Sequence, residues 1–469
     1  MCSSDLMCRE KALNRACLFE AALLWFTGCY QYPVRGFMAF SRHITASPFL
    51  RSLRSRNYRL FVIGQSISLI GTWMQNVAMS WLVYRLTGSA LLLGVIGFTS
   101  QIPTFVLAPL AGVLADRWNR RHLLVATQAL AMLQAAVLAT IVLSETVQVW
   151  HVVCLSLLLG IVNAFDIPVR QSFVVEMVDY REDLGNAIAL NSSMVQSARL
   201  IGPTIAGLLI AVVGEGVCFI LNSISYLAVL MVLVAMRMGT SPHYGKSRGR
   251  IVHELHEGVR YVFSFSPIRN ILMLVGFISL AGMPYTVLVP VFAKEILHGG
   301  AHTFGYLMTA GGCGALVGTL TLASRKSVLG LGRTIIIAGL LFTTGLTVFA
   351  LSSKLVLSLL SLVLTGYGAT TIVASCNTIL QTILEEDKRG RVMSFFTVAF
   401  LGMAPFGSLG AGTAAKLIGP QGALLTGAGC CLLATLMFAR HLPRIRDSIR
   451  PIYVRMGILS ETVKASDTT

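Results

Sequence analysis

The chain of 469 residues contains twelve long apolar segments, each long enough to cross a lipid bilayer as a helix. A helical crossing takes about 20 mostly apolar residues, and the lipid interior requires every backbone polar group to be bonded within the protein. Hydrophobic residues make up 55% of the chain and charged residues only 12%, against about 25% in a soluble globular domain. We therefore predict an all-α integral membrane protein. The segments are 60–83, 90–113, 122–143, 149–174, 186–213, 217–236, 270–293, 303–323, 334–351, 355–382, 392–417 and 421–438.

Positive charge is divided unequally between the connections, and this division predicts the orientation. The chain has 37 Lys and Arg against 20 Asp and Glu. If both termini are cytoplasmic, 31 of these 37 lie in the tails and cytoplasmic connections, and four lie outside. The basic charge is then a topology signal and an attraction to anionic lipid, so we expect no nucleic-acid partner.

Six segments, a long basic connection and six more segments predict two pseudo-symmetric six-helix bundles. Glycine spacing supports this duplication. At an offset of 205, Gly207 corresponds to Gly412, and at an offset of 211, Gly94 corresponds to Gly305. Internal repeats around a central site are typical of secondary transporters, although small residues also favour close helix packing by themselves.

We expect natural translation to start at Met38, so that residues 1–37 are a non-native extension. The intact mass of the protein from its native locus tests this expectation. The predicted organisation of the whole chain has five parts. The parts are a cytoplasmic N-terminal tail (1–57), a first bundle (58–236), a cytoplasmic linker with an amphipathic helix (237–269), a second bundle (270–438) and a basic cytoplasmic tail (439–469).

The connection after the second segment reads GVLADRWNRR at residues 112–121 and resembles the loop signature of the major facilitator superfamily. The resemblance implies a conformational latch between the halves, in which Asp116 meets a helix N-terminus near Arg391. Asn119 replaces a glycine of the signature, and we expect it to keep a left-handed backbone. A simple positively charged connection is the alternative. The matching residues are Gly112, Asp116, Arg117, Arg120 and Arg121.

The fifth segment partly resembles the signature of exporters in this superfamily, through Gly202, Pro203 and Gly207, while three of its glycines are alanine here. Pro203 cannot donate a hydrogen bond to the carbonyl of Arg199, which loosens the helix at that point. The resemblance implies a bend near the substrate cavity of a proton-exchanging exporter. An ordinary proline kink is the alternative.

Three stretches make the chain similar to the enterobactin-exporter and macrolide-efflux branch, the transmembrane secretion effectors: NAFDIPVRQSFVVEMV at 163–178, NAIALNSSMVQSARLIGPTIAG at 186–207 and RGRVMS at 389–394. The resemblance implies a bacterial inner-membrane exporter of a drug, siderophore or metabolite, working by proton antiport and alternating access. We expect a monomer with no cofactor, driven by the proton gradient. An uptake permease of the same fold and a non-transporting sensor or lipid-handling protein are the alternatives.

Apart from Lys416 at the outer end of the segment 392–417, three charged residues fall inside predicted segments, namely Asp166, Arg170 and Arg199. Charges at this depth are costly, so they should face protein or water and have partners. Asp166 and Arg170 share a helix face, being four residues apart. One hypothesis is that Asp166 binds the coupling proton, and the other is a permanent ion pair with Arg170 or Arg199 that only stabilises the fold.

Uncharged amides inside the segments are candidates for the lining of a substrate cavity, because a few polar groups orient ligands in apolar pockets. Interhelical hydrogen bonding is the alternative for each. No phosphate-binding loop, H-E-x-x-H motif or zinc-type cysteine spacing occurs, so we predict neither an enzyme nor a metal site. The candidates are Gln65, Gln75, Asn76, Gln101, Asn163, Asn191, Gln196, Asn377 and Gln381.

Overall fold

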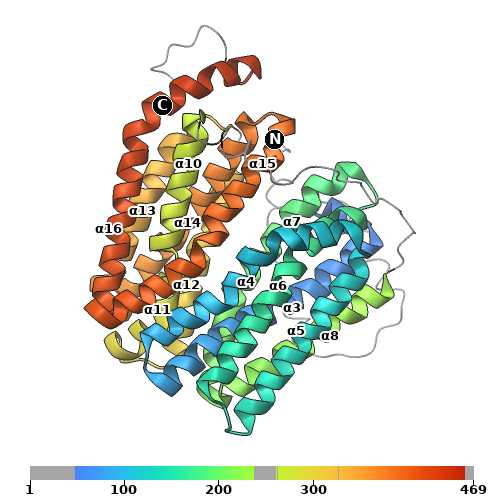
Figure 1. The fold of residues 1–469 in the computed structure, drawn as a ribbon, viewed down its shortest axis with the longest axis vertical. Helices are drawn as coiled ribbons and strands as arrows, with labels where there is room; N and C mark the ends of the chain where they lie inside the picture. Colours follow the sequence, from blue (N-terminus) through green and yellow to red (C-terminus); the bar gives the residue numbers. More distant parts are fainter. Residues whose placement is uncertain (1–47, 237–259, 261, 263, 326, 460–469) are drawn as a thin grey trace, which may run out of the picture. The chain divides into compact units, whose positions relative to one another are not determined.

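A computed structural model of the chain describes residues 48–236, 260, 262, 264–325 and 327–459, without the side chains of 108–117 and a few single positions. Its elements in these ranges are all helices (Figure 1). Ten continuous helical stretches in these ranges are long and apolar enough to cross a membrane. Large apolar side chains such as Val212, Leu417 and Val356 are more than two-thirds exposed, and surfaces of this kind are stable only against lipid or a partner. The prediction of an all-α protein with many apolar spans is confirmed.

The first six long helices pack mainly on one another. Helix α3 contacts α7 and α8, α8 contacts α5, α5 contacts α6, and α6 contacts α4. The short helix η1 (Pro48–Arg54) precedes them, and η2 (Arg181–Asp183) lies before α7. The bounds are α3 (Arg56–Thr87), α4 (Ala90–Arg117), α5 (Arg120–Leu143), α6 (Val149–Met177), α7 (Leu184–Val213) and α8 (Glu215–Ala235).

The later helices are interrupted by π-helical turns close to prolines. A proline lacks the backbone donor that a continuous helix needs, and a π turn absorbs the resulting mismatch. Pro284 follows η3, and Pro405 follows η5. The bounds are α10 (Ser266–Phe277), η3 (Ile278–Gly282), α11 (Tyr285–Val291), η4 (Phe292–Ile296), α12 (Ala301–Ala323), α13 (Leu331–Leu351), α14 (Leu355–Ile383), α15 (Glu386–Thr397), η5 (Val398–Gly402) and α16 (Ala404–Arg455).

Helix α16 is interrupted at Gly419, which has a left-handed backbone with a φ of 78°. Glycine adopts this conformation without a Cβ clash, and Pro420 follows it directly. The break separates the two apolar segments predicted at 392–417 and 421–438. Beyond it the helix continues to Arg455, well past the predicted end of the last segment.

Two pairs of glycines bring the earlier and later helices together. A Cβ atom on Gly207 of α7 would lie 2.8 Å from the Cα of Gly305 on α12, and one on Gly412 of α16 would lie 2.9 Å from the Cα of Gly94 on α4. Both contacts lie near the helix ends at the α3–α4 turn, which we call the α3–α4 end. Since no side chain fits between the helices there, the backbones approach closely.

Candidate functional site

Asp166 is buried in α6, with 4% of its surface exposed. One carboxylate oxygen accepts hydrogen bonds from Thr127 Oγ1 at 3.0 Å and Gln128 Nε2 at 2.7 Å, both on α5. The other oxygen lies 3.5 Å from Nε of Arg170, one turn further along α6. A buried carboxylate is tolerated when donors of this kind surround it. The sequence suggested Arg170 or Arg199 as the partner of Asp166. In this cluster the partner is Arg170.

The Gln128 side chain has an unused acceptor. Its Oε1 is buried without a hydrogen-bond partner among the described residues. A glutamine amide presents donors at one end and an acceptor at the other, and the two ends have nearly the same shape. By rotating, Gln128 can donate to an ionised Asp166 or accept from a protonated one. The cluster therefore has the chemistry to hold the carboxyl group in either protonation state.

A second polar cluster is a chain of amides that joins four helices. Asn222 Nδ2 donates to Gln75 Oε1 at 2.8 Å, Gln75 Nε2 donates to Gln134 Oε1 at 2.9 Å, and Gln134 Nε2 donates to the carbonyl of Leu155 at 3.3 Å. Both ends of the Gln75 amide are thus used in hydrogen bonds between α3, α5 and α8. Gln75 is only 1% exposed, so the structure places it in interhelical packing.

Arg199 lies where α7 meets α3, α11 and α12. Its guanidinium carbon is 5.7 Å from the centre of the Trp73 ring, and the group interacts with the Tyr285 hydroxyl. The Arg199 carbonyl packs against Gly312, whose Cβ would be 3.1 Å away. Sequence reasoning missed Trp73 and Tyr285, because contacts between distant segments leave no local spacing signal.

The remaining cavity candidates take varied environments. Gln65 is buried, and its Oε1 has no partner among the described residues. Gln101 donates to a carbonyl of its own helix at 3.1 Å, whereas Gln196 donates across the α7–α12 contact to Thr319 at 3.1 Å. Of the rest, Asn76, Asn163, Asn191 and Asn377 are half-buried, and Gln381 is exposed.

The glycines of the exporter-like motif face two different neighbours. A Cβ on Gly202 would lie 2.5 Å from the Cβ of Trp73 on α3, and Gly207 abuts Gly305 on α12. Pro203 lies inside α7 and is buried between them. The motif therefore gives α7 two smooth surfaces, one toward α3 and one toward α12.

The loop motif is described only in part. Gly112, Asp116 and Arg117 end α4, but their side chains are outside the described residues, as is that of Arg391. Arg120 pairs with Glu176 on α6. Arg121 Nη2 donates to the Val234 carbonyl of α8 at 3.0 Å. These two arginines thus join the start of α5 to the ends of α6 and α8.

The expectation of a left-handed Asn119 is wrong. Its φ of −65° and ψ of 112° are extended, and its side chain accepts hydrogen bonds from the backbone of Arg121 at 3.0 Å and of His122 at 3.3 Å. Asn119 is the N-cap of α5, and capping requires an extended backbone.

At the start of α15, the hydrogen bond from Lys388 to Glu385, at 2.6 Å, lowers the pKa of that carboxyl below its usual range. The contribution of this pair is present at neutral pH and is lost as the pH falls through the lowered value. Glu385 is exposed and Lys388 is only half-buried, so the pair has a small effect.

These long apolar helices, with their buried polar clusters and close glycine contacts, have the architecture of the major facilitator fold. A solved D-xylose–proton symporter has the same fold, with a TM-score of 0.64 over 81% of this chain and 97% of that one, at 17% identity. The chain belongs to the transmembrane secretion effector family, whose profile matches residues 46–453. The predicted resemblance is confirmed.

Curated relatives cover most of the chain. A staphyloferrin A transporter from Staphylococcus aureus is 25% identical, over 75% of this chain and 87% of its own length. The multidrug efflux pump Tap from Mycolicibacterium fortuitum is 24% identical, over 80% of this chain and 93% of its own length. These relatives and the solved symporter are transporters, so the prediction that the chain is not an enzyme is confirmed.

Proposed function

We propose that the protein exports a small organic molecule, such as a drug, siderophore or metabolite, in exchange for protons. The names of the relatives, a staphyloferrin A transporter and a multidrug efflux pump, support this class of cargo. In this proposal the protein is a cofactor-free monomer of the bacterial inner membrane. The observation that carries the proton exchange is the buried Asp166, held by Thr127, Gln128 and Arg170.

In the proposed architecture twelve spans form two six-helix bundles. The first, predicted at 58–236, corresponds to α3 to α8. The second, predicted at 270–438, corresponds to 266–296, α12, α13 and α14, and then the two stretches on either side of Gly419. The break at Gly419 supports counting these two stretches separately. The Lys and Arg distribution supports placing both tails, 1–57 and 439–469, and the linker 237–269 in the cytoplasm.

Alternating access is supported by the two glycine contacts, which are related by the internal repeat. The contact of Gly94 with Gly412 corresponds to that of Gly305 with Gly207 under the two sequence offsets. At the same end Trp81 stacks on Phe304 with ring centres 6.1 Å apart, and Tyr84 hydrogen-bonds Glu295. We infer that this is the periplasmic gate, and that the bundles rock about it.

The latch remains part of the proposal. Arg120 and Arg121 fasten α5 to α6 and α8 at the opposite end from the glycine contacts. Such fastening supports the movement of these helices as one body, which a rocking mechanism requires.

A transport experiment tests the proposal in two stages. First, a pump-deficient bacterial host with and without the protein is screened for resistance to a panel of antibiotics and dyes. Second, a compound so identified is given to everted vesicles. We expect energised accumulation that a protonophore abolishes, together with proton release from the vesicles on adding the compound. Accumulation only in right-side-out vesicles would indicate an uptake permease, and phospholipid flipping without compound transport would indicate lipid handling.

A further inference from the structure

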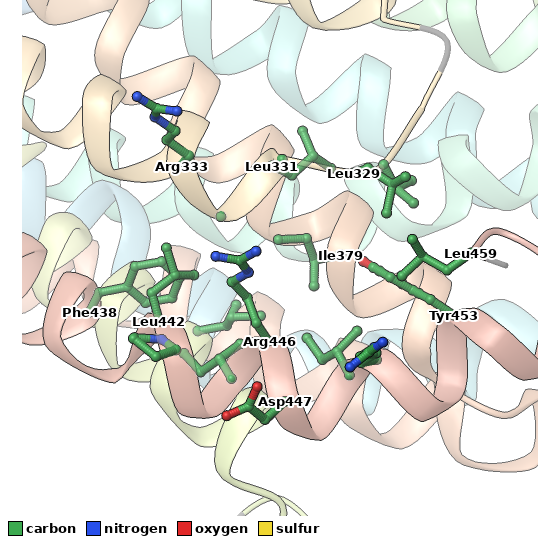
Figure 2. Close-up of a pocket in the computed structure, with 18 residues that line it drawn as sticks. Leu329, Leu331, Arg333, Ile379, Phe438, Leu442, Arg446, Asp447, Tyr453 and Leu459 are labelled. Atoms are coloured by element: carbon green, nitrogen blue, oxygen red, sulfur yellow. The ribbon is translucent and has the colours of Figure 1, made fainter. Parts of the chain in front are cut away.

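A pocket of about 320 Å³ lies between the end of α16 and the ends of three neighbouring helices. Its walls come from α10, from α14, from the connection that leads into α13, and from the part of α16 beyond residue 437. Figure 2 shows this pocket, with Arg333 on one wall and Arg446 extending from α16 between the walls. In Figure 1 the last turns of α16, in red, bend away from the rest of the helix. Pro443 and Pro451 lie inside this helix and cannot donate a helical hydrogen bond.

The pocket has an apolar interior and a basic rim. Ile271, Phe438 and Ile449 are at most 5% exposed. Arg446 and Arg450 are half-buried and lie four residues apart, hence on one helix face. Arg333 lines the opposite wall, and the first turn of α13, which also lines the pocket, adds the positive potential of a helix N-terminus.

The lining has an excess of positive charge. Among the described lining residues, three are arginines and one, Asp447, is an acid. In Figure 2 Asp447 projects away from the Arg446 guanidinium. Guanidinium groups bind phosphate oxygens through paired hydrogen bonds. A volume of about 320 Å³ is at the small end for ligand pockets, so it admits a headgroup and not two acyl chains.

We propose that this pocket binds the phosphate headgroup of an anionic phospholipid of the surrounding membrane. Arg446, Arg450 and Arg333 hold the phosphate, and the acyl chains leave along the apolar side chains toward the bilayer. The position at the ends of the membrane-spanning segments, where lipid headgroups lie, supports a lipid over a dissolved phosphate. This inference requires that the protein lies in a membrane, and it does not depend on which molecule the protein transports.

The test measures lipid binding by native mass spectrometry of the purified full-length protein in detergent. Phosphatidylglycerol and phosphatidylcholine are titrated separately, and sn-glycerol 3-phosphate serves as the water-soluble headgroup alone. The variant is Arg446→Gln with Arg450→Gln. Its matched control is Arg440→Gln with Arg444→Gln, which removes the same charge at the same spacing from exposed positions of the same helix.

We expect wild type and control to bind phosphatidylglycerol alike and in preference to phosphatidylcholine. The pocket variant should bind it about thirtyfold more weakly, since each arginine near a lipid surface contributes about fivefold. Arg333→Gln, on the exposed opposite wall, provides a second variant with an expected loss of about fivefold. Equal affinities of pocket variant and control would overturn the proposal, and so would binding of sn-glycerol 3-phosphate as tight as that of the lipid.

Discussion

The closest partners of the Asp166 carboxylate are neutral. Gln128 and Thr127 donate at 2.7 and 3.0 Å, whereas Arg170 lies at 3.5 Å, beyond the 2.7–2.9 Å of a strong charge-assisted hydrogen bond. If Asp166 and Arg170 formed only a structural ion pair, we would expect their contact to be shorter than 3.5 Å. Arg170 is therefore the weaker of the contacts that hold Asp166 in place.

The first prediction concerns this carboxyl. Asp166→Asn should fold, with the free energy of unfolding lowered by about 2 kcal/mol because one charged hydrogen-bond acceptor is lost. Protonophore-sensitive export should disappear, because asparagine does not take up a proton at this position. Thermal unfolding in detergent and export from everted vesicles measure the two effects.

The control is Glu145→Gln, which neutralises an exposed acid outside the clusters and should leave both measurements unchanged. A well-folded Asp166→Asn protein with undiminished proton-driven export would return Asp166 to a structural role.

Sequence reasoning reached part of this cluster. The four-residue spacing placed Asp166 and Arg170 on one face, as the structure shows. The donors Thr127 and Gln128 come from another helix, and their pairing depends on the packing register of α5 on α6. A single sequence does not encode that register in any local pattern, and the same is true of Trp73 beside Arg199.

At the scale of elements, the glycine contacts make a direct prediction. Gly412→Val on α16 should lower stability by about 1–3 kcal/mol, since its Cβ would press on the backbone of α4, 2.8 Å from the Ala90 carbonyl oxygen. Export should fall as well, because the α3–α4 end would no longer close. Unfolding and export assays measure these effects.

The matched control lies two residues earlier on the same helix. A Cβ on Gly410 meets nothing within 4 Å, so Gly410→Val should change stability by no more than about 0.5 kcal/mol. Equal effects of the two substitutions would mean that helix propensity, and not the close approach of α4 and α16, determines the outcome.

The ends of the helices were predicted from the sequence with unequal success. The span predicted at 149–174 corresponds to α6 at Val149–Met177. Hydropathy falls after residue 438, yet α16 continues to Arg455 because Ile445, Ile449 and Tyr453 recur at helical spacing and are buried. Their burial depends on α10, α13 and α14, so the basic pocket appears only in three dimensions.

At the scale of the molecule, the orientation is the proposal with the widest consequences. In a background lacking the ten native cysteines, Glu145→Cys should react with a membrane-impermeant maleimide added to intact cells. Ser247→Cys, in the linker, should react only after the cells are permeabilised. Labelling of Ser247→Cys in intact cells would contradict twelve spans and the assignment of the glycine contacts to the periplasmic side.

Asp166 and its three partners all lie on α5 and α6. A proton bound there and a cargo bound between the bundles would not displace each other sterically. Protons and cargo should therefore not compete for binding. Acidifying the periplasmic face should raise the maximal turnover and leave the half-saturating cargo concentration unchanged. Steady-state measurements at several pH values check this, and a half-saturating concentration that rises in proportion to acidity would indicate a shared site.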